Sequence, residues 1–310
     1  MDYKESLSAV EAAELLKITK NTVYELVKRG EIPSYKVGKK LRIDKCDVEE
    51  YINKQKGIVA TKNNNEHVNE QSVLKEENDI IISGQDMILD IIAEKMRESE
   101  MSYRILRANA GSYTSLFDLY NDKISMCSCH LWDGDTDEYN ISYVKKLLPG
   151  TEFILINLAY RNIGFYVEKG NPHKIQCWND LLNEDITIVN REKGSGVRIL
   201  IDEKLRVNNI DNKNINGYKN IKQSHFSVAA SIARGEGNVG VGNEKVAAQV
   251  KGIDFIPIQE EKYDIVIKKC DLEKPFFKEV IALIQSKDFK SEVESLGFYD
   301  LREIGKVTGL

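Results

Sequence analysis

Two short stretches near the start of the chain carry apolar side chains at every third or fourth position, the spacing of an amphipathic helix. The first follows Ser8 and Glu11, which have the Ser-x-x-Glu spacing of a capping box. The second covers residues 20–29, with Thr19 as a candidate N-cap and Gly30 as the residue that ends it. Two short helices joined by a tight turn predict a helix-turn-helix, whose second helix enters the major groove of DNA.

A basic β-hairpin is predicted directly after the helix pair. Residues 32–43 alternate as two short strands around a Gly-Lys-Lys turn, and Asp44 can cap a third helix that carries Val48, Tyr51 and Ile52. The basic side chains of the hairpin could each meet a DNA phosphate. They are Lys36, Lys39, Lys40 and Arg42.

Residues 7–52 closely resemble the excisionase-type winged helix-turn-helix, a relative of the MerR DNA-binding domain. The resemblance rests on the order of a helix, a Thr-x-x-Thr-Val-Tyr helix, Gly-x-Ile-Pro, a basic hairpin and a helix. It implies that five residues of the second helix face DNA, although the same residue types also fit a solvated helix surface. These five are Lys20, Asn21, Thr22, Tyr24 and Lys28.

After the winged helix-turn-helix region at residues 1–57, which we call the head, the pattern of apolar and polar residues changes twice. Residues 54–78 are polar and Asn-rich without a sustained period, which predicts a flexible linker. Strand-like and helix-like runs then alternate, which predicts a parallel α/β sheet. We therefore divide the chain into a winged helix-turn-helix domain at 1–57, a linker at 58–78 and a ligand-binding domain at 79–310.

The ligand-binding domain is predicted to have two lobes. Its chain starts one α/β series, enters a second and returns, so lobe 1 takes about 79–158 and 259–310 and lobe 2 about 159–258. The predicted helices are 87–98, 112–120, 197–206, 227–234, 275–286 and 289–296. The predicted strands are 79–82, 103–107, 124–129, 153–160, 163–167, 186–190, 239–241, 255–258 and 263–267.

Several motifs of the body occur in an order that resembles the molybdate-binding-protein-like domain of cytoplasmic regulators, which is also fused to some molybdopterin-biosynthesis proteins. The resemblance spans about residues 79–306 and implies a two-lobed α/β fold of the type II periplasmic-binding-protein-like class. The motifs lie at 83–90, 137–140, 157–165, 170–172, 190–198, 215–218 and 224–235.

Free N–H groups and the positive end of the dipole make helix N-termini natural anion sites. Four loop-to-helix junctions fit this chemistry, at 83–86, 111–112, 194–196 and 227–228. The resemblance implies that serine hydroxyls and main-chain N–H groups at these junctions hold a tetrahedral oxyanion. The candidate ligand-binding residues from the junctions are Ser83, Gly84, Ser112, Ser195, Gly196, Ser227 and Val228.

Charged and titratable residues near the predicted ligand site are compatible with more than one kind of anion. Arg191 and Arg198 could contact a ligand and favour a carboxylate or sulfate-like group, or they could form structural ion pairs. His130 and His225 are equally compatible with a ligand role and a structural one. Transport relatives often have a tyrosine where this chain has Asn243 after a glycine-bearing strand. The candidate ligands are therefore a molybdate- or tungstate-like oxyanion or a small carboxylate.

Composition narrows the class of protein. The 44 basic and 49 acidic residues give a net charge of −5, which argues against a protein that coats nucleic acid along its whole length. Residues 1–57 carry 12 Lys and Arg against 10 Asp and Glu, so the head alone is slightly basic. The start lacks a signal pattern and no apolar run approaches the length of a membrane span, so we expect a cytoplasmic protein without a membrane partner.

The five cysteines are scattered, which fits reduced thiols better than a disulfide framework. Cys127, Cys129 and His130 form the one cluster that could suggest a metal, but its spacing lacks a second ligand pair and buried thiols are the better interpretation. Residues 235–240 match G-x-G-x-x-G, yet a predicted helix precedes them and a strand follows, the reverse of a dinucleotide site.

These patterns predict a ligand-responsive transcription regulator that binds double-stranded DNA and a small anion, with a homodimer as the expected assembly. No catalytic residue, cofactor or metal is expected, because no Walker, His-Glu-x-x-His or Gly-x-Ser-x-Gly motif is present. An enzyme of periplasmic-binding-protein fold linked to molybdopterin metabolism is the alternative. A phage-type architectural excision factor fits less well, because DNA bending does not require so large a body.

Overall fold

The computed structural model describes residues 6–29, 31–38, 40–45, 47–48, 51, 78–99 and 102–309. The chain forms two compact units, Met1–Leu74 and Lys75–Leu310, and the division falls within the predicted linker. The predicted helix end at Gly30, the predicted phosphate contact at Lys39 and the linker up to residue 77 lie outside the described residues.

The first unit has two short helices and a small antiparallel sheet of strand order β1-β3-β2. Reciprocal hydrogen bonds between Ser8 and Glu11 confirm the predicted capping box, and Thr19 caps the second helix by accepting from the N–H of Thr22. Strand β1 was not predicted, and it pairs with β3. The elements are β1 (Ser6–Ser8), α1 (Ala9–Leu16), α2 (Lys20–Lys28), β2 (Tyr35–Val37) and β3 (Lys40–Asp44).

A compact apolar core holds the first unit together. Val23 and Leu26 of α2 are buried against Ala12 and Ala13 of α1, and Ile43 adds the hairpin to the same cluster. Val23 and Leu26 lie three residues apart on one face of α2, so the opposite face of this helix remains in solvent. Residues 45, 47, 48 and 51 are helical, in agreement with the predicted third helix.

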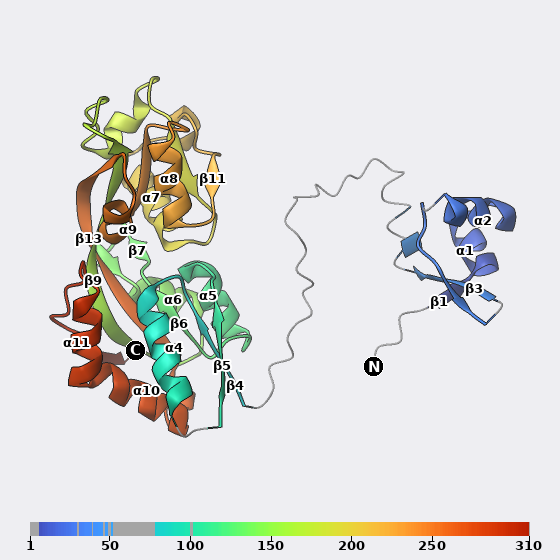
Figure 1. Ribbon diagram of the computed structural model, residues 1–310, viewed down its shortest axis with the longest axis horizontal. Helices are drawn as coiled ribbons and strands as arrows, with labels where there is room; N and C mark the ends of the chain where they lie inside the picture. The colour runs from blue at the N-terminus through green and yellow to red at the C-terminus, as the bar shows by residue number, and fades with distance from the viewer. Residues whose placement is uncertain are drawn as a thin grey trace. The chain divides into compact units, whose positions relative to one another are not determined.

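The second unit is built on a nine-stranded sheet of order β11-β10-β12-β9-β13-β6-β4-β5, with β14 beside β9. Figure 1 shows α4, α10 and α11 at one end of the long strands β9 and β13, and α7, α8 and α9 at the other. The strands are β4 (Asp79–Ser83), β5 (Arg104–Ala108), β6 (Met126–Cys129), β7 (Trp132–Asp133), β8 (Glu138–Tyr139), β9 (Phe153–Glu168), β10 (Ile188–Arg191), β11 (Ile221–Lys222), β12 (Val239–Asn243), β13 (Ile253–Lys268) and β14 (Val307–Gly309). The α-helices are α4 (Met87–Glu98), α5 (Ser112–Tyr120), α6 (Ile141–Leu147), α7 (Gly196–Val207), α8 (His225–Ala233), α9 (Glu244–Gln249), α10 (Pro275–Gln285) and α11 (Lys287–Ser295).

The predicted parallel sheet is confirmed only in part. Strand β4 runs parallel to β5 and β6, and β10 runs parallel to β11 and β12. Strands β9 and β13, however, pair antiparallel with each other along most of their length, and they join the two parallel groups by further antiparallel pairings. The α/β alternation therefore identified each parallel group but not the antiparallel strands between them.

Strands β9 and β13 each replace two predicted strands. The predicted gap in β9 came from Arg161 and Asn162, which interrupt the apolar pattern. Strand β9 nevertheless continues through both residues, because Arg161 is 6% exposed and has carboxylate partners. Register shifts in the β9–β13 pair lie between Pro257 and Gln259 and between Tyr263 and Asp264.

Four hydrophobic clusters contain residues of β9 or β13, and two of them mark where these strands pass from one core to another. One core takes Ala159 of β9 and Tyr263 of β13 together with α4, α10 and α11. The other takes Ile163 of β9, and Ile258 of β13 packs against it, together with α7. On each strand, residues that pack in one core are followed within a few positions by residues that pack in the other. The unit therefore has two lobes that share β9 and β13. The exact lobe limits given above stay a prediction.

Candidate functional site

A small cavity of about 20 Å³ lies between the two lobes. Five helices begin at its wall: Asp86, Gly111, Ser195 and Asn243 are the N-caps of α4, α5, α7 and α9, and His225 is the first residue of α8. Helix N-termini carry partial positive charge and unpaired N–H groups. Their convergence therefore makes the cavity favourable for negative charge.

The N-terminus of α5 differs from the other four. Helices α4, α7, α8 and α9 each have a side-chain cap, whereas α5 has none. Ser112, the first residue of α5, is 4% exposed and lies on the cavity wall. An anion in the cavity could therefore accept hydrogen bonds at the start of α5 without displacing a cap.

The lobes touch each other at glycines beside the cavity. The N–H of Tyr113 on α5 donates to the carbonyl of Gly194 at 3.1 Å. A Cβ atom at Gly111 would lie 2.5 Å from that same carbonyl oxygen, and one at Gly196 would collide with the ring of His130. Glycine is therefore needed at both positions for the lobes to approach so closely.

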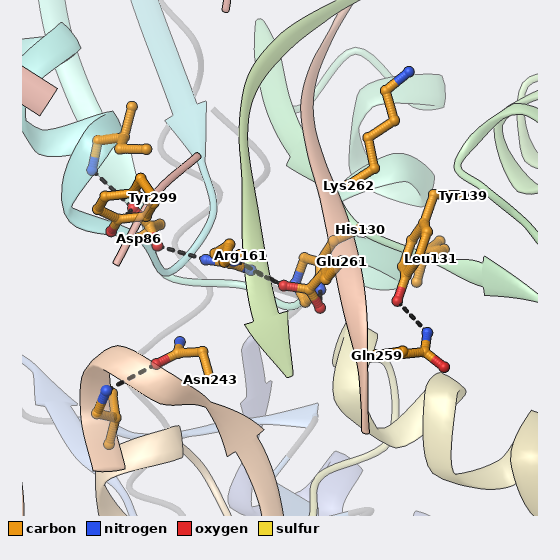
Figure 2. Close-up of polar contacts among 12 residues, drawn as sticks. Asp86, His130, Leu131, Tyr139, Arg161, Asn243, Gln259, Glu261, Lys262 and Tyr299 are labelled. Atoms are coloured by element: carbon orange, nitrogen blue, oxygen red, sulfur yellow. Dashed lines mark hydrogen bonds and ion pairs between the residues drawn. The ribbon is translucent and has the colours of Figure 1, made fainter. Parts of the chain in front are cut away.

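A chain of buried charges crosses the cavity floor on β9 and β13. Arg161 Nη1 donates to Asp86 Oδ2 at 2.5 Å and Nε donates to Glu261 Oε1 at 2.7 Å, while the hydroxyl of Tyr299 donates to Asp86 Oδ1 at 2.9 Å. His130 Nδ1 lies 2.7 Å from Glu261 Oε2. Figure 2 shows Tyr299, Asp86, Arg161 and Glu261 in a continuous row. We call these five residues the floor cluster.

Glu261 of the floor cluster is ionised. Burial opposes ionisation of Glu261, but the charges of Arg161 and His130 outweigh burial and lower its pKa to about 2. The guanidinium of Arg161 also lies 4.1 Å from the ring centroid of Tyr263, a cation–π contact on the same wall. Each charge of the cluster is therefore met within the protein.

Arg191 brings a second guanidinium to the cavity from lobe 2. Its side chain is 1% exposed, and its Nε and Nη2 atoms donate to Glu192, whose side chain is 18% exposed. Nη2 also donates to Gln85 Oε1 at 2.9 Å, a hydrogen bond that joins the lobes. Arg191 is thus paired with a carboxylate that solvent reaches, unlike the carboxylates around Arg161.

His225 places a neutral imidazole on the wall. Its Nδ1 atom is buried and has no hydrogen-bond partner among the described atoms. Burial, followed by the charges of Arg191 and Arg161, lowers its pKa well below the usual value. A neutral ring leaves this nitrogen able to hydrogen-bond a bound group without adding charge.

The structure brings five of the predicted ligand residues to the cavity wall: Ser112, His130, Arg191, Ser195 and Gly196. His130 is also paired with Glu261, so it has the structural contact that was one of its two predicted roles. Ser195 accepts from the N–H of Arg198 and donates to the carbonyl of Glu192. The binding role of all five stays a prediction.

The other five predicted ligand residues do not line this cavity. The Ser83 hydroxyl hydrogen-bonds that of Ser115, and Gly84 has a φ of +142° beside Ser128, where a side chain would not fit. Arg198 donates to Asp202 and to the carbonyl of Arg191, which is the ion pair considered as its alternative.

The predicted junction at Ser227 and Val228 is displaced by two residues. Helix α8 begins at His225, because Ser224 and Ser227 cap each other reciprocally. Ser227 is therefore occupied by the cap, and Val228 is fully buried in an apolar cluster. The group that reaches the cavity from this helix is His225.

The sequence interpretation missed Arg161, Ser128 and Tyr263 on the wall and Glu261 in the floor cluster. A usable signal was present, because Arg161 interrupts the most apolar run of the chain. An arginine retained in such a run needs a buried carboxylate partner. Glu261 lies 100 positions away, so local spacing could not identify that partner.

The DNA-facing residues predicted on α2 lie on its outer surface. Lys20, Asn21, Thr22, Tyr24 and Lys28 are all exposed. Thr22 hydrogen-bonds Thr19 through their hydroxyls at 2.8 Å, and Lys20 Nζ lies 5.8 Å from the ring centroid of Tyr24. In the hairpin, Lys36 and Lys40 are exposed and Arg42 is half-buried.

Cys127 and Cys129 are fully buried on β6, as the thiol interpretation predicted, and burial raises the pKa of both. Within the described part of the chain, no group of three or more His, Cys, Asp or Glu side chains could hold a metal ion. Over the same residues, no helix is long and apolar enough to cross a bilayer. Helix α8 precedes the G-x-G-x-x-G segment and β12 begins within it at Val239, so helix and strand have the predicted order.

Comparison with known proteins defines the class. The family model of the PBP superfamily domain matches residues 93–285, and that of a helix-turn-helix domain matches residues 6–56. The chain belongs to the PBP superfamily and carries an N-terminal helix-turn-helix domain. The predicted fold class is thereby confirmed.

The chain is also similar to a bacterial protein and to solved structures. The Bacillus subtilis protein YvgK is 38% identical over 99% of both chains. A putative phosphate ABC transporter substrate-binding protein from Clostridium perfringens has a TM-score of 0.54 at 16% identity, over 73% of this chain and all of the other. A phosphate transport receptor from Vibrio cholerae has a TM-score of 0.50 at 17% identity, over 72% of this chain and 99% of the other. Both solved structures are similar to this chain in fold.

Proposed function

We propose that the protein is a cytoplasmic transcription regulator that binds double-stranded DNA through its first unit and a small anion in the cavity of its second. The supporting observation is the convergence of five helix N-termini and the buried Arg191 on one interlobe cavity. The candidate anions remain a molybdate- or tungstate-like oxyanion or a small carboxylate. The Clostridium perfringens structure, described with bound phosphate, supports an anion at such a site.

The proposed DNA interface is that of an excisionase-type winged helix-turn-helix. The exposed face of α2 would reach base edges, while Lys36 and Lys40 of the hairpin would meet phosphates. Asn21→Ala should therefore reduce binding to a specific duplex far more than to a random one. Lys36→Ala with Lys40→Ala should weaken both and lower the salt slope. Equal losses on both duplexes for Asn21→Ala would contradict the interface.

Closure of the two lobes would couple anion binding to DNA binding. The contacts that join the lobes, such as Arg191 with Gln85 and Tyr113 with Gly194, surround the cavity. An anion held by groups of both lobes favours the closed arrangement over an open one. In a homodimer, a change in closure would alter how two DNA-binding units are presented to two half-sites. The proposed mode of action is binding rather than catalysis.

Anion binding is tested most simply by thermal unfolding of the full chain with molybdate, tungstate, sulfate, phosphate and small carboxylates. A ligand at about 100 times its Kd adds about 2.7 kcal/mol of stability. We expect at least one of these anions to raise the Tm of the native protein and to have a much smaller effect on Arg191→Lys. Equal shifts for both proteins would contradict the site, since Lys keeps the charge but loses the planar donors.

A further inference from the structure

A second, larger cavity adjoins the small one. It has a volume of about 640 Å³ and opens to solvent, and the two share a layer of wall residues that includes Gln85, Gly111, His225 and Asn243. We call the small cavity the chamber and the larger one the groove. Only these shared wall residues therefore lie between the groove and a ligand group that occupies the chamber.

The groove has apolar walls from both lobes. Met87, the first residue of α4, is 49% exposed, and Phe226, on α8, is 54% exposed. Singly exposed apolar side chains are normal on protein surfaces, but these two line the same groove. Tyr299 and Lys245 line the same groove, with Lys245 Nζ 4.7 Å from the ring centroid of Tyr299.

The chamber admits only a compact group. Its volume is about 20 Å³, against about 640 Å³ for the groove. A carboxylate head is compact enough for the chamber, and the body of such a ligand would then lie in the groove.

The charges around the chamber also favour a single negative charge. Arg161 is met by Asp86 and Glu261, and Arg191 is met by Glu192, so the wall offers no surplus of cations to balance a dianion. The cost of transferring an ion from water rises with the square of its charge. A monocarboxylate held by helix N-termini is consequently easier to bind here than a doubly charged oxyanion.

We infer that the ligand is an organic monocarboxylate whose head occupies the chamber and whose apolar body lies in the groove between Met87 and Phe226. This inference rests on the proposed function and narrows its ligand from small anions in general to one chemical class. The body would contact both lobes, because α4 and α8 belong to different lobes. Burial of the body then favours the closed arrangement together with the head.

Calorimetry of the full chain with acetate, hexanoate, benzoate, phosphate and molybdate tests the inference. We expect hexanoate or benzoate to bind at least about tenfold more tightly than acetate, phosphate or molybdate, because only the first two bury apolar surface in the groove. Phe226→Ala should lower the affinity for that carboxylate about tenfold and leave the affinity for acetate unchanged. Phe117→Ala is the matched control, since Phe117 is 55% exposed and lies outside the groove.

The outcomes separate this inference from the proposed function. If phosphate or molybdate binds more tightly than every carboxylate, or if Phe226→Ala and Phe117→Ala behave alike, the inference is overturned. An anion whose binding still depends on Arg191 would in that case leave the proposed function intact. If none of the five anions binds, or if Arg191→Lys binds each of them as the native protein does, the proposed function fails together with the inference.

Discussion

The two arginines of the cavity show two different ways of holding a buried charge. Arg161 lies between Asp86 and Glu261, which are 8% and 1% exposed. Arg191 lies beside Glu192, which solvent reaches, and takes its remaining contacts from the neutral groups Gln85 and Gln223. The first arrangement is electrically complete without a ligand. The second leaves a guanidinium on the cavity wall whose partner can be hydrated.

This difference assigns the two sides of the cavity to different tasks. The floor cluster fixes the crossing strands β9 and β13 against the N-terminus of α4, so it belongs to the stability of the unit. The side made by Arg191, the uncapped α5 and the glycines belongs to ligand binding and lobe contact. Substitutions on the floor should therefore change the free energy of unfolding, and substitutions on the other side should change affinity.

The largest effect is expected for Arg161→Met. Removing the guanidinium leaves the buried carboxylates of Asp86 and Glu261 without a countercharge, and breaking a buried ion pair in this way costs about 3–5 kcal/mol. Urea unfolding should show that loss. Arg161→Met combined with Glu261→Gln should recover part of it, because the second change removes one uncompensated charge. Additive losses in the double variant would contradict the cluster.

Ser112→Ala should mainly affect affinity. The hydroxyl lies on the cavity wall, and a lost hydrogen bond to an anion costs about 1.5–3 kcal/mol, or roughly tenfold to over a hundredfold in affinity. The free energy of unfolding should change little, because α5 has no side-chain cap to lose. Ser286→Ala is the control, since Ser286 caps α11 away from the cavity and its loss should cost about 1 kcal/mol of stability. Calorimetry and urea unfolding on both variants distinguish the two roles.

Gly111→Ala should hold the lobes apart. Alanine suits the backbone there, because φ is −71°, but its Cβ would lie 2.5 Å from the carbonyl oxygen of Gly194. That neighbour is backbone and cannot rotate away, so the closed arrangement should lose about 1–3 kcal/mol by overpacking. Ligand affinity should fall accordingly. Scattering measurements that find the same closure on ligand addition in the variant and the native protein would disprove the contact.

The smallest effect is a pH dependence from His225. Burial and the charges of Arg191 and Arg161 hold its pKa well below 6.5, so below that pH the unfolded chain binds a proton that the folded chain does not. The free energy of unfolding should therefore fall with decreasing pH, by up to about 1.4 kcal/mol per pH unit. His225→Gln should reduce this slope between about pH 5 and 6.5. The carboxylate of Glu261, with a pKa of about 2, titrates below that window.

Sequence alone predicted what is encoded locally. The caps at Ser8 and Thr19 and the bounds of α4 and α5 follow from residues three or four apart, and the structure has them as predicted. The predictions failed where contacts between residues far apart in the sequence determine the structure. Arg161 is held within β9 by ion pairs with Asp86 and Glu261, which lie 75 and 100 positions away in the sequence. The start of α8 was also misplaced, because the reciprocal cap between Ser224 and Ser227 sets it at His225.

The same limit applies to the candidate site. Glycines and serines at helix starts led to Ser112, Ser195 and Gly196, because loop-to-helix junctions can be recognised within a few residues. Arg198 could not be separated from Arg191 by sequence, because both flank the same glycine loop. Only the fold shows that one guanidinium faces the cavity and the other faces Asp202.

The most direct test of the account is whether an anion in the cavity changes DNA binding. The full chain selects a duplex from a random pool, and its affinity for that duplex is then measured by anisotropy with and without an anion that calorimetry shows to bind. We predict a change of about 5- to 150-fold, the range of typical couplings of 1–3 kcal/mol, and a much smaller change for Ser112→Ala at the same anion concentration. An affinity for DNA that is identical with and without the bound anion would contradict the account.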